Sequence, residues 1–153
     1  MLTRKAFVVF CALLAASCGG SGSTGSSSPS AAASTATVAV AHNDKLGAIL
    51  VDGSGRTLYL FEADKTIKST CYSACATYWP PLLTNGAPLA GAGANAALLG
   101  TTKRTDGTSE VTYAGHPLYY VVTDHNPGDA TGQGVNNFGA PWDVVGPDGN
   151  QIG

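Results

Sequence analysis

Short apolar runs separated by glycine-containing turns form the hydrophobic pattern of this chain from about residue 46 onward. Leu46 to Val51 is an apolar run that ends at Asp52-Gly53-Ser54-Gly55, and a second apolar run follows from Thr57 to Phe61. Asp-Gly and Ser-Gly supply the positive φ angles that tight hairpins require. The pattern therefore predicts a strand, a turn and a second strand.

The same pattern occurs a second time further along the chain. Glu110 to Tyr113, a turn at Ala114-Gly115-His116 and a run from Pro117 to Val122 repeat the hairpin. The hexapeptide Tyr59-Leu60-Phe61-Glu62-Ala63-Asp64 returns as Tyr119-Tyr120-Val121-Val122-Thr123-Asp124. Two copies are too few for a solenoid, which needs three or more. We therefore expect one globular domain with internal pseudo-symmetry and repeats at about residues 46–83 and 108–149.

The fold class expected from these runs is mainly β. Leu58 to Phe61 and Leu118 to Val122 are apolar at odd and even positions alike, which is typical of strands covered on both faces, with the tyrosine hydroxyls at a polar rim. We predict a single small domain built from two pseudo-symmetric β-hairpin repeats, with little helix beyond a turn near Asn95 to Leu99. The expected core consists of two aromatic or apolar positions and one tryptophan from each copy: Tyr59, Phe61, Trp79, Tyr119, Val121 and Trp142.

The first 17 residues have the organisation of a secretory signal. Arg4 and Lys5 precede an apolar run, Ala6 to Ala16, that is too short to span a membrane. Cys18 follows the small residues Ala15-Ala16-Ser17 and precedes two glycines. This arrangement favours a bacterial lipoprotein signal, in which Cys18 is acylated, over an ordinary cleaved signal. The expected location is the extracytoplasmic side of the bacterial cell membrane, held there by the lipid anchor.

A Gly/Ser/Ala-rich stretch follows the signal, and we assign residues 18–41 to it. Its composition cannot bury enough apolar surface to offset chain entropy, so it is predicted to be a disordered tether. A flexible coil of this kind spans on the order of 25 Å on average. The remaining residues, 42–153, suit one core of ordinary size.

Charge narrows the range of partners. Removing residues 1–17 deletes two of the eight basic side chains and none of the ten acidic ones, which leaves an acidic mature chain. The only adjacent basic pair beyond the signal is Lys103-Arg104. Binding to nucleic acid rests on concentrated positive charge and is therefore disfavoured. The expected partners are the membrane, through the anchor, and an envelope protein or a small ligand.

Cys71 and Cys75 are the cysteines of the mature domain and permit three interpretations. In an exported chain, such a pair is most simply a structural disulfide. A regular helix holds residues i and i+4 too far apart for this bond, so the segment must be distorted locally. A redox pair and a metal site are the alternatives. Soft thiolates with an imidazole from His116 or His125 would suit copper.

Asp64 and Asp124 each follow a predicted strand. The carboxylates fit turns in which they accept backbone N–H groups, and they alternatively fit a ligand site formed with Tyr59, Phe61 and Tyr119. No cofactor is expected, because the sequence has no dinucleotide fingerprint, no phosphate loop and no Gly-x-Ser-x-Gly elbow. The segment from Asp124 begins like a calcium loop but has Val135 where a bidentate glutamate is required.

Taken together, these motifs resemble a known family. The chain resembles bacterial predicted lipoproteins with a Tyr-x-aromatic-x-x-Asp motif. The resemblance lies in the order of these features: the lipoprotein-type signal, the two Tyr-x-x-x-x-Asp hexapeptides, Cys71 to Cys75, Trp79-Pro80-Pro81-Leu82, the Tyr113-to-Tyr119 segment and Trp142. These proteins are also described as a secreted repeat of unknown function. The second copy departs from the motif, since Val121 stands in the aromatic position. The resemblance implies a duplicated unit outside the cytoplasm and no assigned activity.

Two functions from different classes follow from these observations. The first is a non-catalytic, lipid-anchored binding or structural module of the cell envelope, which we favour because a cysteine pair outside the cytoplasm is usually structural. The second is an envelope protein for redox or copper handling that uses Cys71, Cys75 and His116. No nucleophile and base can be paired from their spacing, so the chain is not expected to be an enzyme.

Overall fold

The computed structural model describes residues 34–153, and the predicted signal, Cys18 and most of the predicted tether lie outside this range. Its elements in chain order are β1 (Thr37–Asn43), β2 (Gly47–Asp52), β3 (Tyr59–Phe61), α1 (Ala74–Tyr78), β4 (Leu89–Ala90), a 3-10 turn (Ala96–Leu98), β5 (Leu99–Lys103), β6 (Ser109–Tyr113), β7 (His116–Pro117), β8 (Val135–Asn137) and β9 (Ala140–Val144). The fold is mainly β with one short helix, as predicted. No helix within the described residues is long and apolar enough to cross a membrane.

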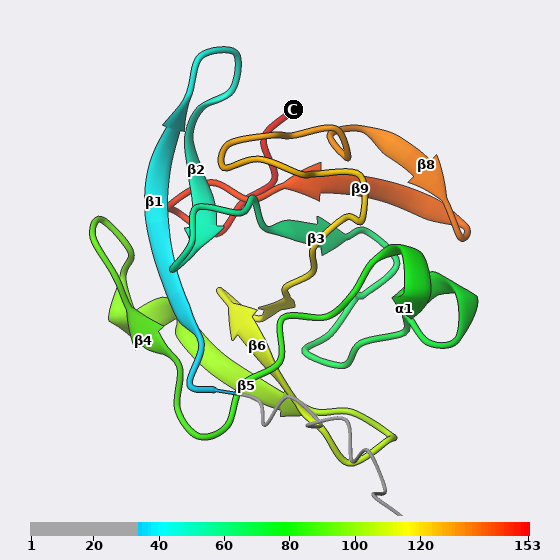
Figure 1. The fold of residues 1–153 in the computed structure, drawn as a ribbon. Coiled ribbons are helices and arrows are strands. Elements are labelled where there is room, and N and C mark those ends of the chain that lie inside the picture. Colours follow the sequence, from blue (N-terminus) through cyan, green and yellow to red (C-terminus); the bar gives the residue numbers. More distant parts are fainter. Residues whose placement is uncertain (1–33) are drawn as a thin grey trace, which may run out of the picture. The chain divides into compact units, whose positions relative to one another are not determined.

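The strands form three small sheets (Figure 1). The orders are β2-β1-β4, β3-β9-β8 and β5-β6-β7. The hairpins β1–β2 and β5–β6 are antiparallel and correspond to each other in the two copies. The second predicted strand of the second copy is shorter than expected, because only His116 and Pro117 join a sheet and Tyr119 makes isolated bridges instead.

The domain begins earlier than the boundary predicted at His42. β1 starts at Thr37 and pairs with the whole of β2, from Val38 opposite Asp52 to Asn43 opposite Gly47. Ala36 and Val38 are buried in the core. The low-complexity composition before them conceals this strand, which is recognisable only from the alternation of valine at positions 38 and 40.

The two copies exchange strands. β3, from the first copy, pairs with β9 at the end of the second copy, and Tyr119 of the second copy bridges to Pro81 at the end of the first. At the centre, Tyr59 and Tyr119 face each other, and each backbone N–H donates to the carbonyl of the other at 2.9 Å. A pseudo-two-fold axis therefore passes between these two tyrosines, and the β3-β9-β8 sheet combines strands of both copies.

Matching hydrogen bonds define which residues correspond in the two copies. Leu58 N–H donates to the Leu50 carbonyl, just as Leu118 N–H donates to that of Val111, both at 3.0 Å. The Leu50 N–H in turn donates to the Val145 carbonyl. The Val111 N–H donates to the Leu82 carbonyl in the same way, and both distances are 2.8 Å. Leu50 is therefore equivalent to Val111, and the preceding residues, Ile49 and Glu110, occupy equivalent buried positions.

The core has two apolar clusters, and the central strands contribute to both. Tyr59 and Phe61 belong to one cluster, whereas Leu58 and Leu60 belong to the other, so both faces of the strand are covered as predicted. All six predicted core residues lie in the first cluster. Its centre is a stack of aromatic rings, with centroids 4.0 Å apart between Phe61 and Trp142 and 4.0 Å apart between Trp142 and Trp79. The tryptophans of the two copies thus stack on each other at the pseudo-axis.

Candidate functional site

The tyrosines and aspartates of the repeated hexapeptide bind each other across the two copies. The Tyr59 hydroxyl donates to Asp124 Oδ2 at 2.6 Å, and the Tyr119 hydroxyl donates to Asp64 Oδ2 at 2.5 Å. Burial, together with the carboxylates, raises the pKa of both tyrosines, so each hydroxyl keeps its proton and donates it. The predicted polar rim is therefore wrong for these hydroxyls, which end inside the core.

The second oxygen of each aspartate closes the loop that follows it. Asp64 Oδ1 accepts from the backbone N–H of Thr70 at 2.7 Å and from its hydroxyl at 2.6 Å. Asp124 Oδ1 accepts the same two bonds from Thr131, at 2.9 and 2.7 Å. Both aspartates accept backbone N–H groups where their strand ends, as the turn interpretation requires, although the donors lie farther along the chain than in an Asx-turn.

These contacts use the polar groups of the residues that were predicted from sequence as an alternative ligand site. Tyr59, Phe61, Asp64, Tyr119 and Asp124 are all buried. Their polar atoms bond to the other copy or to their own loop, as described above. The structure therefore places this set inside the fold, where its polar groups join the two copies.

Cys71 and Cys75 form a disulfide with a Cα–Cα distance of 5.2 Å. Cys71 lies before α1 and Cys75 within it, and Ser73 between them has a φ of 53° and a ψ of −122°. The Cys75 N–H donates to the Tyr72 carbonyl at 3.1 Å, which completes a type II′ turn. This turn is the distortion that the spacing required. Within residues 34–153, no group of three His, Cys, Asp or Glu side chains is placed to hold a metal ion.

Replacing Ser73 with glycine is expected to stabilise the domain. The first central position of a type II′ turn requires a positive φ, which glycine adopts without the steric cost that serine bears there. The greater freedom of glycine in the unfolded chain offsets part of this gain. We expect Ser73→Gly to raise the free energy of unfolding by about 0.5–1 kcal/mol in urea denaturation. Thr77→Gly, inside α1, is the control and should destabilise.

A buried ion pair lies beside the disulfide segment. Arg104 Nη1 donates to Glu110 Oε2 at 2.6 Å, and Arg104 Nη2 donates to the Cys71 carbonyl at 2.7 Å. The Tyr72 ring covers the guanidinium, 4.4 Å from centroid to Cζ. Burial, reinforced by the nearby Asp64 carboxylate, raises the pKa of Glu110 to about 7 in spite of Arg104.

This shift predicts a decrease in stability as pH rises. Between pH 4.5 and about 7, the folded state keeps a proton on Glu110 that the unfolded state releases. Stability falls where the folded state binds more protons, so we expect a loss of about 2–3 kcal/mol across this window. Glu110→Gln, measured by urea denaturation at each pH, should remove this decrease, while Glu62→Gln at a half-exposed position should keep it. Parallel pH profiles for the wild type and Glu110→Gln would contradict the assignment.

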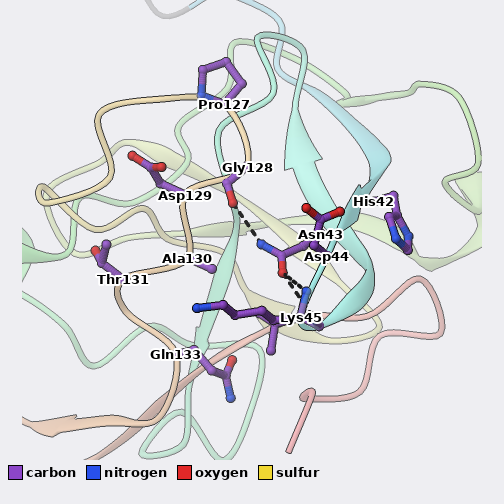
Figure 2. Close-up of a pocket in the computed structure, with 11 residues that line it drawn as sticks. His42, Asn43, Asp44, Lys45, Pro127, Gly128, Asp129, Ala130, Thr131 and Gln133 are labelled. Atoms are coloured by element: carbon purple, nitrogen blue, oxygen red, sulfur yellow. Dashed lines mark hydrogen bonds between the residues drawn. The ribbon is translucent and has the colours of Figure 1, made fainter.

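A cleft of about 680 Å³ lies between the turn of the β1–β2 hairpin and the loop that leads to β8. Figure 2 shows the two walls, joined where Asn43 Nδ2 donates to the Gly128 carbonyl at 3.0 Å. The Lys45 side chain extends across the gap toward Ala130 and Thr131, while His42 lies on the other side of the hairpin. The lining residues are His42, Asn43, Asp44, Lys45, Leu46, Pro127, Gly128, Asp129, Ala130, Thr131 and Gln133.

The cleft arises where the two copies differ. Asn43 and Arg104 hold equivalent positions at the ends of their hairpins, and each donates to a backbone carbonyl of a loop in the opposite copy. On the Arg104 side, the long guanidinium and the Tyr72 ring pack against the disulfide segment. On the Asn43 side, a short amide meets a loop with glycines at 128, 132 and 134. Smaller side chains on both walls therefore leave an open cleft beside Asn43, whereas the equivalent space beside Arg104 is filled.

The polar groups of the cleft fall into two classes. The amides of Asn43 and Gln133 and the hydroxyl of Thr131 are engaged in hydrogen bonds of the fold. Within residues 34–153, the charged ends of Asp44 and Lys45 make no hydrogen bond or ion pair with another residue. Asp129 is ionised near neutral pH, because the backbone N–H groups of Asn126 and His125 hold its pKa below the ordinary value. The cleft is therefore lined by one ammonium and two carboxylates, and Oδ2 of Asp129 already accepts from the backbone N–H groups of His125 and Asn126 at 3.0 and 2.8 Å.

Sequence reasoning did not find this cleft. None of its lining residues is among the candidate site residues predicted from sequence, which belong to the repeated motif and the cysteine segment or are histidines elsewhere. The available signal was the loop after Asp124, which replaces the cysteine segment of the first copy with glycine turns. Differences between copies mark positions that the shared fold does not determine.

Comparison with known proteins identifies a family that this chain matches. A family model described as a secreted repeat of unknown function matches residues 40–83 and 100–146. These two stretches cover most of each hairpin copy. Searches of curated proteins and of solved structures return no significant match. A secreted repeat with a disulfide indicates an extracytoplasmic protein.

Proposed function

The chain belongs to the family described as a secreted repeat of unknown function, and on that premise we propose that it is a non-catalytic binding module of the bacterial cell envelope, lipid-anchored through Cys18. One observation carries the proposal. The polar groups of the repeated motif are used inside the fold, whereas the charged residues Asp44, Lys45 and Asp129 line an open cleft. The motif builds the scaffold, and the cleft is the binding site.

The size and charge of the cleft suit a small polar solute. Small-molecule sites usually enclose about 300–1,000 Å³. The ammonium of Lys45 fits a carboxylate, while Asp44 and Asp129 fit an ammonium or hydroxyl group of the ligand. Leu46, Ala130 and Pro127 supply apolar wall between these groups. A zwitterionic or amino-bearing sugar of the envelope combines these features.

The arrangement of side chains supports binding rather than catalysis. Nucleophilic catalysis by a hydroxyl or thiol commonly relies on a histidine base within hydrogen-bond reach. Within the described residues, no histidine side chain makes a hydrogen bond to serine, threonine or cysteine. Redox or copper handling has no specific observation in its favour, because Cys71 and Cys75 are buried and bonded to each other and therefore offer no thiolate.

The proposal is tested by titrating isotope-labelled protein, residues 18–153, with three probes in heteronuclear NMR. We expect muramic acid, which carries both an ammonium and a carboxylate, to bind more tightly than glucosamine, and glucosamine more tightly than glucose. Saturable shifts should occur at Lys45, Ala130 and Thr131. Lys45→Ala should weaken muramic acid binding about tenfold, the loss of one charge-assisted contact.

Lys68→Ala is the matched control, since Lys68 is an exposed lysine in the loop of the first copy and does not line the cleft. It should leave the affinity unchanged. The proposed site is wrong if all three probes leave the cleft resonances unshifted, or if Lys45→Ala and Lys68→Ala weaken binding equally.

A further inference from the structure

Three exposed apolar side chains gather at one corner of the domain, away from the cleft. Tyr78 at the end of α1, Val122 and Phe138 have exposed fractions of 38%, 41% and 46%. The rings of Tyr78 and Phe138 lie 6.4 Å apart between centroids, and the Val122 N–H donates to the Tyr78 carbonyl at 3.2 Å. In Figure 1 the tip of the β8–β9 hairpin lies beside α1. We call these three residues the aromatic corner.

Phe138 is held outward in an unfavourable backbone conformation. It occupies the tip of the β8–β9 hairpin with a φ of 56°, followed by Gly139 with a φ of 100°. Hairpin turns of this kind favour asparagine or glycine at the first position, and a bulky residue there is an outlier. Asn137, next to it, accepts from the indole N–H groups of Trp79 and Trp142 at 2.9 and 3.2 Å. The tip is therefore fixed to the aromatic stack of the core.

The segments that build the corner carry no charged side chain of their own. Residues 72–83, 117–123 and 130–142, which build it, contain no lysine, arginine, aspartate or glutamate. Asp124, which follows the second of these segments, is buried against Tyr59. Aromatic residues with neutral polar neighbours are typical of surfaces that contact the boundary between lipid headgroups and acyl chains.

The exposed area of the aromatic corner and the length of the chain before the domain favour a lipid surface over a protein partner. Three half-exposed side chains offer on the order of 200 Å², well below the ~800 Å² per partner of a stable protein interface. A lipid anchor on Cys18 leaves 15 residues between it and the described domain, a length of chain that spans about 55 Å at most. A domain of this size is about 35 Å across, so the chain reaches far enough to turn any face toward the membrane. Because the anchor keeps the domain at a high effective concentration near the membrane surface, a weak contact is sufficient to orient it.

We propose that the aromatic corner docks on the surface of the lipid bilayer that holds the anchor, and that it thereby orients the domain. Phe138 and Val122 enter the headgroup boundary, and Tyr78 lies beside them with its hydroxyl toward water. This inference rests on the lipid anchor of the proposed function but not on ligand binding in the cleft.

The test attaches the chain to vesicles chemically. Residues 18–153 are coupled through the Cys18 thiol to a maleimide lipid in phosphatidylcholine vesicles that contain spin-labelled lipid as quencher. A tryptophan is introduced at one position at a time, and the emission of the parent chain, which contains Trp79 and Trp142, is subtracted. We expect Phe138→Trp to lose roughly half of the added emission to the quencher, as a side chain in the headgroup boundary does.

Ile67→Trp and Leu89→Trp are matched controls, because these residues are exposed by 50% and 57% but lie outside the corner. Their added emission should persist. Equal quenching at all three positions, or none at 138, overturns the proposal. Because the anchor is supplied chemically, the result does not depend on lipidation in cells, and Lys45→Ala should leave the quenching unchanged.

Phe138→Asn provides a second test, in a variant that is expected to stay folded. Asparagine suits the positive φ at this position, so the variant should be at least as stable as the wild type. In the Leu89→Trp background it should increase the rotational freedom of the tethered domain, measured as a drop in tryptophan anisotropy on vesicles. Unchanged anisotropy in this folded variant overturns the docking role of Phe138.

Discussion

Expressed separately, either copy of the repeat is expected to remain unfolded as a monomer. Cutting the chain between Gly93 and Ala94 separates β3 from β9 and Tyr119 from Pro81. It also removes the stacking of Trp79 on Trp142. Each fragment then exposes its half of the aromatic cluster and leaves strand edges unpaired. A fragment of about 60 residues is already marginal when its core is intact, so these losses exceed the stability available.

The measurement is circular dichroism and NMR of residues 34–93 and 94–153, alone and mixed. Each fragment alone should show the spectrum of an unfolded chain, and an equimolar mixture should recover the native spectrum, since all contacts across the cut are noncovalent. The mixture is the internal control for damage by the cut itself. A monomeric fragment with dispersed native resonances would contradict the exchanged topology.

The duplication and the core were predictable from sequence, while the pairing of the strands was not. Alternation and apolar runs identify buried positions, and all six predicted core residues, including Trp79 and Trp142, lie in one cluster. The same pattern is produced whether β3 pairs within its own copy or with the other copy. Strand exchange depends on the long-range contacts of Tyr59 with Tyr119, which no local signal reports.

The roles of polar residues were harder to predict for a related reason. Asp64 and Asp124 follow strands, and this position suits a turn or a ligand site equally well. Their actual partners, Tyr119 and Tyr59, lie in the opposite copy. The cleft escaped prediction because it depends on the absence of bulk opposite Asn43, and single-sequence patterns report which residues are present rather than the space between them.

Removing Arg104 alone is expected to destabilise the domain by about 3–5 kcal/mol, because Glu110 then remains buried without its cation. The side chain of Glu110 is fully inaccessible, and its Oε1 already has no hydrogen-bond partner within the described residues. Arg104→Met keeps much of the apolar volume and removes the charge and the donors. The loss should be smaller at pH 4.5 than at pH 8, because a protonated carboxyl tolerates burial better than an ionised one.

Removing both charges is expected to recover most of this loss. Ile49 occupies the position equivalent to Glu110 in the first copy, where it packs in the aromatic cluster. The fold therefore accepts an isoleucine at this point of the hairpin. Replacing a buried ion pair with apolar residues of similar volume is often neutral or stabilising. We expect Arg104→Met/Glu110→Ile to be more stable than Arg104→Met by at least about 2 kcal/mol in urea denaturation.

The double variant also separates the two roles of Arg104. If its main contribution is to neutralise Glu110, the double variant approaches the wild type and its dependence on pH between 4.5 and 7 becomes flatter. If its bonds to Ser69 and the Cys71 carbonyl dominate instead, the double variant stays as unstable as Arg104→Met. That outcome would contradict our assignment and would identify Arg104 as the residue that holds the disulfide segment on the β5–β6 hairpin. Since the equivalent Asn43 uses its amide for a similar contact without any buried charge, we expect the first result.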